Sequence, residues 1–257
     1  MKIGIIGAGA MGCLYASMLA EKHSVTLFDV WQPSVDAINA DGITVLAPND
    51  TDKVIRVPAL MSGAGHEPLD LVILFVKDMA SESALDGNRA IIGADTLLLS
   101  LQNGMGNYDI MQRFAPAEHI LLGTTKHNCV AKAPGVIYHS GAGITHIGSP
   151  AGDRAAADRI AEAFGICGIE AEACDNVNHL IWEKLFVNMT VNPITALLGS
   201  TIGVIASDPD VRAAAYTLIC EAAAVAAADG EEFDPDVVFA ALMDTAAHLA
   251  TGKASMC

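Results

Sequence analysis

The residues Gly7-Ala8-Gly9-Ala10-Met11-Gly12 determine how the N-terminal part of this chain folds. They form a G-x-G-x-x-G pattern directly after the apolar run 3–6 and directly before residues 11–22, which are apolar at helical spacing. In such a strand–loop–helix unit, Gly7 permits the tight turn, Gly9 lets the backbone approach a pyrophosphate, and Gly12 lets the helix pack closely on the strand. The helix N-terminus then offers free N–H groups and the positive end of its dipole to the phosphates. We therefore expect residues 7–12 to bind a dinucleotide, with a glycine-rich turn that has no ligand as the alternative.

Asp29 follows the second apolar run, 25–28, at 22 residues after Gly7. An acid at this place in a dinucleotide-binding unit accepts hydrogen bonds from the adenosine ribose. A carboxylate there repels the 2′-phosphate of NADPH, and the next residues, Val30 and Trp31, supply no cation. The sequence thus predicts NAD(P)H as cofactor and favours NADH, unless Asp29 is only a solvated acid at a strand end.

Short apolar runs alternate with helical patterns through the first two thirds of the chain, which is typical of βαβ units and a parallel sheet. The predicted buried strands are residues 3–6, 25–28, 71–76 and 96–101, and the helices between them are residues 11–22, 33–39 and 79–85. Residues 120–125, 136–140 and 144–147 lie close together around Pro134-Gly135 and 141–143, so we expect antiparallel strands that complete the sheet. A helix over 153–164 and a strand over 169–174 follow.

Strand patterns stop after Asp175. Residues 177–198, 210–228 and 234–249 all have helical patterns, and Asp-Pro pairs mark the starts of the last two. The predicted fold class is therefore α/β, with a Rossmann-type domain over residues 1–175 and a smaller all-α domain over 176–257.

Composition excludes several classes of function. With 14 Lys and Arg against 30 Asp and Glu, the net charge of −16 opposes binding of nucleic acid. The 6 cysteines have no paired or metal-type spacing, and no histidine has metal-ligand spacing, so we expect reduced thiols, no metal site and a cytoplasmic protein. No stretch of about 18 uncharged apolar residues is present, which argues against a membrane span. Residues 1–20 could be mistaken for a signal peptide, but that interpretation leaves their glycines unexplained.

Lys184, Asn188 and Asn192 are spaced i, i+4, i+8 in an otherwise apolar helical segment. Helical geometry places all three on one face. A solvated polar stripe is the alternative, although asparagine is a poor helix former for that purpose.

The segment from Trp182 to Asn192 resembles the W-x-K-L-x-x-N-x-x-x-N signature of the ketopantoate reductase (2-dehydropantoate 2-reductase) family. Further stretches resemble the family in the same order along essentially the whole chain. They are residues 7–12, Val76-Lys77, 101–104 (Leu-Gln-Asn-Gly), 135–148 with His139, and 253–256 (Lys-Ala-Ser-Met).

The resemblance implies reduction of 2-dehydropantoate to pantoate on the way to pantothenate and coenzyme A. It implies that Lys184 is the general acid, and an ammonium on an apolar helix can have its pKa lowered to suit that task. Asn188, Asn192 and Ser255 would hold the substrate. Lys77 and Asn103 would contact the cofactor and the reacting end of the substrate, with a helix-capping lysine and a turn asparagine as the alternatives. For His139, a surface position is expected more than one near the cofactor.

Family members usually continue for several tens of residues past the Ser-Met pair and include an acidic residue near the active site. We therefore expect either that the C-terminal domain is incomplete or that the site lacks this carboxylate. Two other functions stay open: reduction of another branched 2-keto acid, and NAD(P) binding without turnover. The Ala-rich helices of the second domain could form the face of a homodimer.

Overall fold

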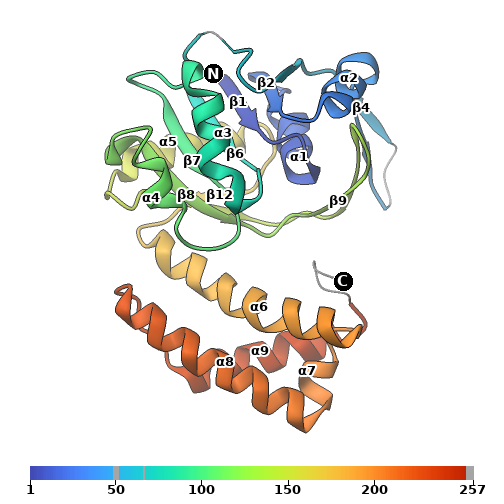
Figure 1. Cartoon of the computed structure of the whole chain (residues 1–257), viewed down its shortest axis with the longest axis vertical. Helices are drawn as coiled ribbons and strands as arrows, with labels where there is room; N and C mark the ends of the chain where they lie inside the picture. Colours follow the sequence, from blue (N-terminus) through green and yellow to red (C-terminus); the bar gives the residue numbers. More distant parts are fainter. Residues whose placement is uncertain (49–51, 66, 253–257) are drawn as a thin grey trace. The chain divides into compact units, whose positions relative to one another are not determined.

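The computed structural model describes residues 1–48, 52–65 and 67–252. The chain divides into two compact units, Met1–Val177 and Asn178–Cys257, each described below by itself (Figure 1). The division lies close to residue 175, where the strand patterns of the sequence end.

The N-terminal unit contains an eight-stranded main sheet with the strand order β12-β11-β8-β7-β6-β1-β2-β5. From β5 to β8 every neighbouring pair is parallel, so these six strands have the 3-2-1-4-5-6 order of a doubly wound dinucleotide-binding fold. The strands are β1 (Lys2–Ile6), β2 (Ser24–Asp29), β5 (Ala59–Met61), β6 (Leu71–Leu74), β7 (Leu97–Ser100), β8 (Ile120–Thr125), β11 (Thr145–Gly148) and β12 (Ala171–Ala173). The predicted parallel sheet is confirmed.

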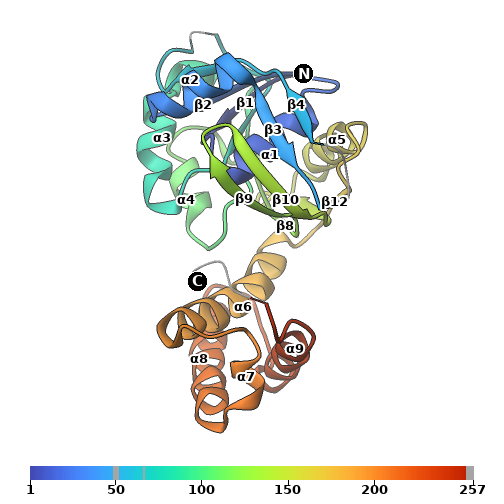
Figure 2. The same cartoon turned by 90° about the vertical axis from the view of Figure 1, so that its right-hand side faces the viewer.

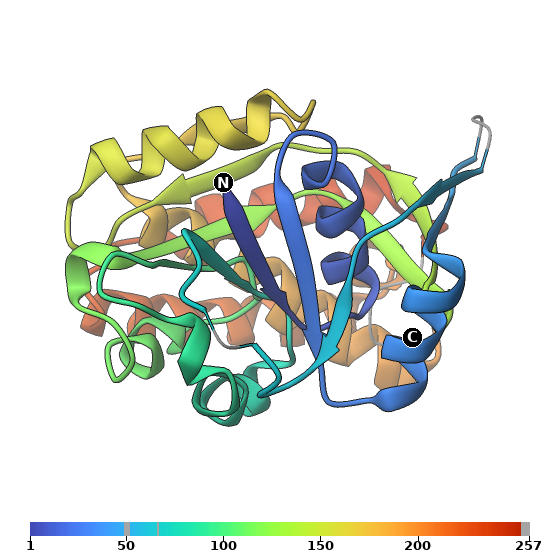
Figure 3. The same ribbon diagram turned by 90° about the horizontal axis from the view of Figure 1, so that it is seen from above.

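Helices cover both faces of this sheet, and Figure 3 shows α5 and α3 on opposite sides of it. They are α1 (Ala10–Leu19), α2 (Gln32–Asp41), α3 (Ser81–Gly87), α4 (Asn107–Met111) and α5 (Arg154–Gly165), with the 3₁₀ turns η1 (Asp78–Ala80), η2 (Arg89–Ile91) and η3 (Ala117–His119). Asp153 caps α5 by accepting a hydrogen bond from the N–H of Ala156.

Residues 136–140 do not complete the main sheet, so that prediction is wrong. Strand β10 (Val136–Gly141) pairs antiparallel with β9 (Asn128–Ala133) and parallel with β3 (Ile43–Leu46), which pairs with β4 (Lys53–Ile55) in a second sheet. The turn at Pro134-Gly135, with φ of 71° at Gly135, joins β9 to β10. The chain thus leaves the main sheet after β8 and returns with β11, the strand that runs antiparallel to β8. Figure 2 shows the second sheet beside α1.

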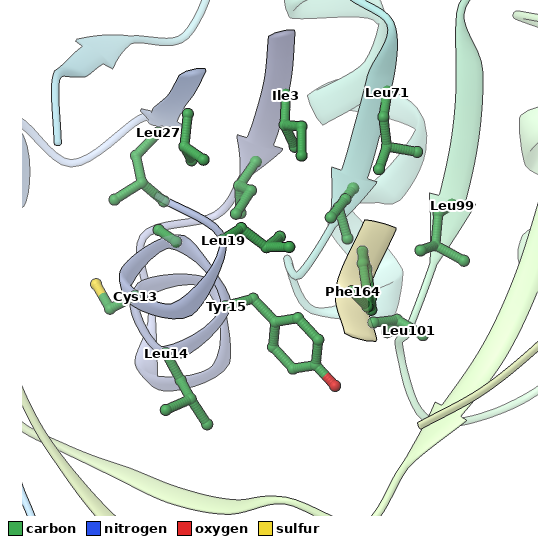
Figure 4. Close-up of a cluster of buried hydrophobic side chains, with 14 of the residues drawn as sticks. Ile3, Cys13, Leu14, Tyr15, Leu19, Leu27, Leu71, Leu99, Leu101 and Phe164 are labelled. Carbon is green, nitrogen blue, oxygen red and sulfur yellow. The ribbon is translucent and has the colours of Figure 1, made fainter. Parts of the chain in front are cut away.

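Helix α1 carries large buried side chains against the main sheet (Figure 4). Tyr15 is fully buried, and its hydroxyl lies 2.9 Å from Oγ1 of Thr125 and 2.6 Å from Oγ1 of Thr145. These contacts join α1 to the ends of β8 and β11. A buried hydroxyl needs such partners, because an unpaired one costs about 1–3 kcal/mol. The core therefore fixes α1, and with it the glycine loop that precedes α1.

The C-terminal unit is helical, as predicted. Its described helices are α6 (Val177–Leu198), whose first residue ends the N-terminal unit, α7 (Val204–Ser207), α8 (Pro209–Ala228) and α9 (Pro235–His248). Asp208 and Asp234 cap α8 and α9 by accepting backbone hydrogen bonds, and proline follows each of them. The short helix α7 was not predicted, because four residues give no periodic pattern.

Helix α8 is long and apolar enough to cross a membrane, judged by length and composition alone. Of its most apolar stretch of 18 residues, 28% is buried inside the protein. It carries Arg212 and Glu221 and packs against α7 and α9. The packed helices of soluble proteins meet the same criteria, so this helix alone is weak evidence for a span.

Candidate functional site

The three glycines of the loop between β1 and α1 meet different demands. Gly7 has φ of 106°, and a Cβ there would lie 2.9 Å from the backbone carbon of Phe75. A Cβ on Gly12 would collide with the carbonyl oxygen of Gly7. A Cβ on Gly9, by contrast, would meet nothing within 4 Å. The fold therefore requires Gly7 and Gly12, whereas the space beside Gly9 is open, as a close approach of a pyrophosphate to the backbone would need.

The N-terminus of α1 suits an anion. Gly9 is its N-cap, no side chain caps the helix, and its first turn holds no acidic residue. Its first backbone N–H groups have no partner within the helix. Ala8, Ala10 and Met11 complete the loop between the glycines, so residues 7–12 have the geometry that a phosphate-binding loop requires, and their binding role stays a prediction.

Asp29 ends β2 and already binds the loop. Its Oδ2 accepts a hydrogen bond of 2.6 Å from the N–H of Ala8, and its Oδ1 accepts one of 2.8 Å from the N–H of Trp31. Each carboxylate oxygen keeps a further lone pair. Asp29 therefore braces the phosphate loop, a role that sequence reasoning missed because it considered only the ligand.

Lys77 and Asn103 lie at the carboxyl edge of the main sheet, where doubly wound folds bind ligands. The ends of β6 and β7 are in register at Leu74 and Ser100, and the two exposed side chains belong to the loops that follow. The structure thus places them on neighbouring loops at the same edge as the glycine loop.

Gln102 ties these two loops together. Its Nε2 donates hydrogen bonds of 2.8 Å to the carbonyl of Val76 and to Oγ of Ser81, and its Oε1 accepts one of 2.9 Å from Ser100. Gln102 therefore fixes the chain on either side of Lys77 and beside Asn103. Its position after a strand and before Asn-Gly was visible in the sequence, but the partners were not.

His127 and His139 form a pair between β8 and the second sheet. Nδ1 of His127 lies 3.1 Å from Nε2 of His139, and the His127 ring packs edge-on against Tyr15. Burial lowers the pKa of His127, and the neighbouring His139 lowers it further. Among the described residues, Nε2 of His127 is buried without a partner. His139 lies near the end of β10, where it is half-buried and paired with His127.

In the C-terminal unit, α6 brings together the predicted polar stripe. Lys184, Asn188 and Asn192 are half-buried, and Nδ2 of Asn192 lies 3.4 Å from Oδ1 of Asn188. Pro193 continues the helix although it has no N–H for the carbonyl of Met189.

Ser255 and a possible metal site are the last two points to place in the structure. Ser255 lies outside the described residues. Within residues 1–48, 52–65 and 67–252, no group of three or more His, Cys, Asp or Glu side chains could hold a metal ion, and the five described cysteines are free.

The fold and these sites define a two-unit protein of the dinucleotide-binding α/β class, with a helical second unit that carries a lysine and two asparagines on one helix. Residues 3–152 match the family described as ketopantoate reductase PanE/ApbA, and residues 176–257 match the C-terminal domain of the same family. The chain belongs to the ketopantoate reductase family.

Individual relatives agree with this assignment. A 2-dehydropantoate 2-reductase of Streptococcus pyogenes serotype M1 is 30% identical over 100% of this chain and 83% of its own length. The enzyme of that name from Pyrococcus abyssi is 34% identical over 91% of this chain and 76% of its own. A solved structure of D-mandelate dehydrogenase with NADH and anilino(oxo)acetate has a TM-score of 0.92 and 30% identity, over 100% of this chain and 84% of the other. The family thus includes proteins with different substrates.

Proposed function

We propose that this protein reduces 2-dehydropantoate to pantoate with NADH as the preferred cofactor. The observation that carries the proposal is the stripe of Lys184, Asn188 and Asn192 on α6, because a keto acid reductase needs a proton donor beside groups that hold a carboxylate and a hydroxyl. The relatives named 2-dehydropantoate 2-reductase support the choice of substrate.

Residues of the N-terminal unit would hold the cofactor. The backbone of residues 7–12 and the N-terminus of α1 would bind the pyrophosphate, Asp29 the adenosine ribose, and Lys77 and Asn103 the nicotinamide half. NADH, when bound, supplies the hydride that reaches the ketone carbon. The support for this assignment is the open space at Gly9 and the uncapped helix.

Residues of the C-terminal unit would act on the substrate. Lys184 would donate a proton to the ketone oxygen as negative charge develops there, a contribution of about 10²–10⁴-fold in rate. Asn188, Asn192 and Ser255 would orient the substrate by hydrogen bonds. Such positioning groups act mainly by fixing the reacting atoms in place.

The preference for NADH rests on the carboxylate of Asp29 beside the loop. A 2′-phosphate there would meet a negative charge, and Val30 and Trp31 offer no cation to offset it. The similar solved structure of D-mandelate dehydrogenase contains NADH, which supports the same cofactor here.

An aromatic 2-keto acid is the second candidate substrate, because the structure of D-mandelate dehydrogenase is so similar to this chain. The test is to follow oxidation of NADH and of NADPH with 2-dehydropantoate, 2-oxoisovalerate and phenylglyoxylate. We expect the largest kcat/KM with 2-dehydropantoate and NADH. A larger value with phenylglyoxylate would assign the second function, and dinucleotide binding without any turnover would exclude both.

A further inference from the structure

The C-terminal half of helix α1 borders a pocket against the second sheet of the N-terminal unit (Figure 2). The pocket has a volume of about 410 Å³, within the range of about 300–1,000 Å³ that is usual for small-molecule sites. Its residues on and just after α1 extend from Leu14 to Glu21. At about 1.5 Å per residue, Met18 lies about 13 Å along the helix from Gly9. The pocket is therefore separate from the glycine loop.

The walls of this pocket are mainly apolar. Four half-buried side chains that pack against the core contribute to them: Met18, Ala20, Val45 and Ile55. Val45 pairs with Lys53 across β3 and β4, and Ile55 follows Lys53 by two residues, so these three side chains lie on the same face of the sheet. Each apolar group that stays in water forgoes stabilisation, so such walls favour an apolar occupant.

The charged groups around this pocket have the opposite balance to the whole chain. Among the described residues, Lys53 and Arg56 are the cations that line it, and Glu21 is the carboxylate. The whole chain, in contrast, has 14 Lys and Arg against 30 Asp and Glu. The carboxylate of Glu21 is itself 3.5 Å from the ammonium of Lys22. The rim of the pocket therefore attracts an anion, although the average field of the protein repels one.

The cations at the rim have donors that an anion could use. Among the described residues, the guanidinium of Arg56 donates one hydrogen bond, to the carbonyl oxygen of Ala40, and a guanidinium has five N–H groups. Lys53 is exposed, and its ammonium has three N–H groups on a flexible chain. His139 also lines the pocket, and its ring is paired with His127. A carboxylate at this rim can accept charge-assisted hydrogen bonds from both cations.

We propose that this pocket is a second ligand site, which binds a single-chain aliphatic carboxylate of medium length. The hydrocarbon chain lies against Met18, Val45 and Ile55, and the carboxylate binds Lys53 and Arg56 at the rim. Apolar walls below a cationic rim select this chemistry. An alkyl amine would place a third cation at the rim, and a short carboxylate would leave the walls in water. The site is independent of the dinucleotide and of the keto acid.

Calorimetric titration of the whole chain with octanoate tests the chemistry of the site. Octanoate should bind at one site, and decanoate about 10-fold more tightly because it buries two more methylene groups. Octylammonium and acetate should bind at least about 10-fold more weakly than octanoate. Saturating NADH should leave the affinity for octanoate unchanged. Equal affinity for octylammonium, or displacement of octanoate by NADH, would overturn the proposal.

A matched pair of double variants tests the position of the carboxylate. Lys53→Gln/Arg56→Gln should weaken octanoate binding by about 10-fold, through loss of two ion pairs. Arg89→Gln/Lys132→Gln removes the same overall charge from exposed residues outside the pocket and should bind octanoate as the wild type does. An equal loss of affinity in the two double variants would mean that the net charge of the protein, and not this rim, determines binding.

A second matched pair tests the position of the hydrocarbon chain. Ala47 lines the pocket in the segment after β3, so Ala47→Leu should fill part of the space and weaken octanoate binding by about 10-fold. Ala131→Leu, at an exposed position of β9, should leave the affinity unchanged. Melting temperatures check that both variants are folded. Wild-type affinity for octanoate in folded Ala47→Leu would overturn the assignment of the pocket.

Discussion

Gly9 and Gly12 belong to one motif but differ in what a side chain would cost. We expect Gly9→Val to leave the melting temperature nearly unchanged and to abolish dinucleotide binding, because its side chain would occupy the open space beside the loop. Gly12→Ala should lower the free energy of unfolding by about 1–3 kcal/mol, because the added Cβ collides with the backbone of Gly7. Thermal unfolding and dinucleotide titration of both variants separate the two effects. A Gly9→Val protein with normal affinity would show that the pyrophosphate binds elsewhere.

Asp29 stabilises the fold as well as being the proposed contact with ribose. Asp29→Ala removes the acceptor of two backbone N–H groups, each bond worth about 1.5–3 kcal/mol because the acceptor is charged. We expect the ratio of NADPH to NADH affinity to rise, mainly through loss of NADH binding, together with a lower melting temperature. The dissociation constants for both cofactors check this expectation. A wild-type protein that strongly prefers NADPH would refute the interpretation of Asp29.

The roles of these residues could be predicted from the sequence only in part. The glycine spacing and the acid after β2 are local patterns, so the loop was predictable. The hydrogen bonds that Asp29 and Gln102 form within the protein were not predictable. The N–H of Ala8 lies 21 residues from Asp29, and Val76 lies 26 residues from Gln102. Hydrogen bonds across such separations depend on how the strands assemble.

Helix α6 carries the residues of the mechanistic prediction. Lys184→Ala should lower kcat by about 10²–10⁴-fold, with dinucleotide affinity nearly unchanged, since it removes the proposed proton donor. Asn192→Ala should instead raise KM for the keto acid, because the proposed role of its amide is to hold the substrate together with the neighbouring Asn188. Steady-state kinetics on both variants distinguish these outcomes. Near wild-type kcat for Lys184→Ala would mean that the proton has another source.

His127, the residue that precedes strand β9, contributes a pH dependence to stability. Burial and His139 lower the pKa of His127 in the folded state, so the unfolded chain, with a pKa of about 6.5, takes up the proton first as the pH falls. The contribution of His127 to stability is complete above pH of about 6.5 and is lost progressively below it. Urea unfolding at several pH values should show this loss, and His127→Asn should reduce it. An identical pH profile in that variant would contradict the prediction.

Strands and helices whose apolar residues recur at a clear spacing were predictable from the sequence, and the second sheet was not. Residues 177–198 form a helix with the predicted bounds, because 22 residues of helical pattern leave little ambiguity. Strands β4 and β5 have three residues each and are partly exposed, so no pattern marks them. The parallel pairing of β10 with β3 joins Val136 to Thr44, a contact that no local signal specifies.

The charge of the whole molecule bears on how fast a cofactor arrives. At a net charge of −16, the average field repels the pyrophosphate of a dinucleotide. Raising the ionic strength from about 0.01 M to about 0.15 M shortens the Debye length from about 30 Å to about 8 Å. The association rate of NADH in stopped-flow fluorescence should therefore rise with salt, and that of uncharged adenosine should not. A rate that falls with salt would show that cations near the loop, such as Lys77, dominate the field.

The pairing of β3 with β10 has a consequence for synthesis on the ribosome. Residues 43–46 emerge early, yet their neighbour at residues 136–138 is translated about ninety residues later. At about 5–20 residues per second, the hairpin of β3 and β4 waits for roughly 5–20 s with one edge uncovered. An uncovered strand edge can pair with another nascent chain. On crowded polysomes, neighbouring copies of this nascent chain can therefore pair with one another during this wait, well before Lys184 has been translated.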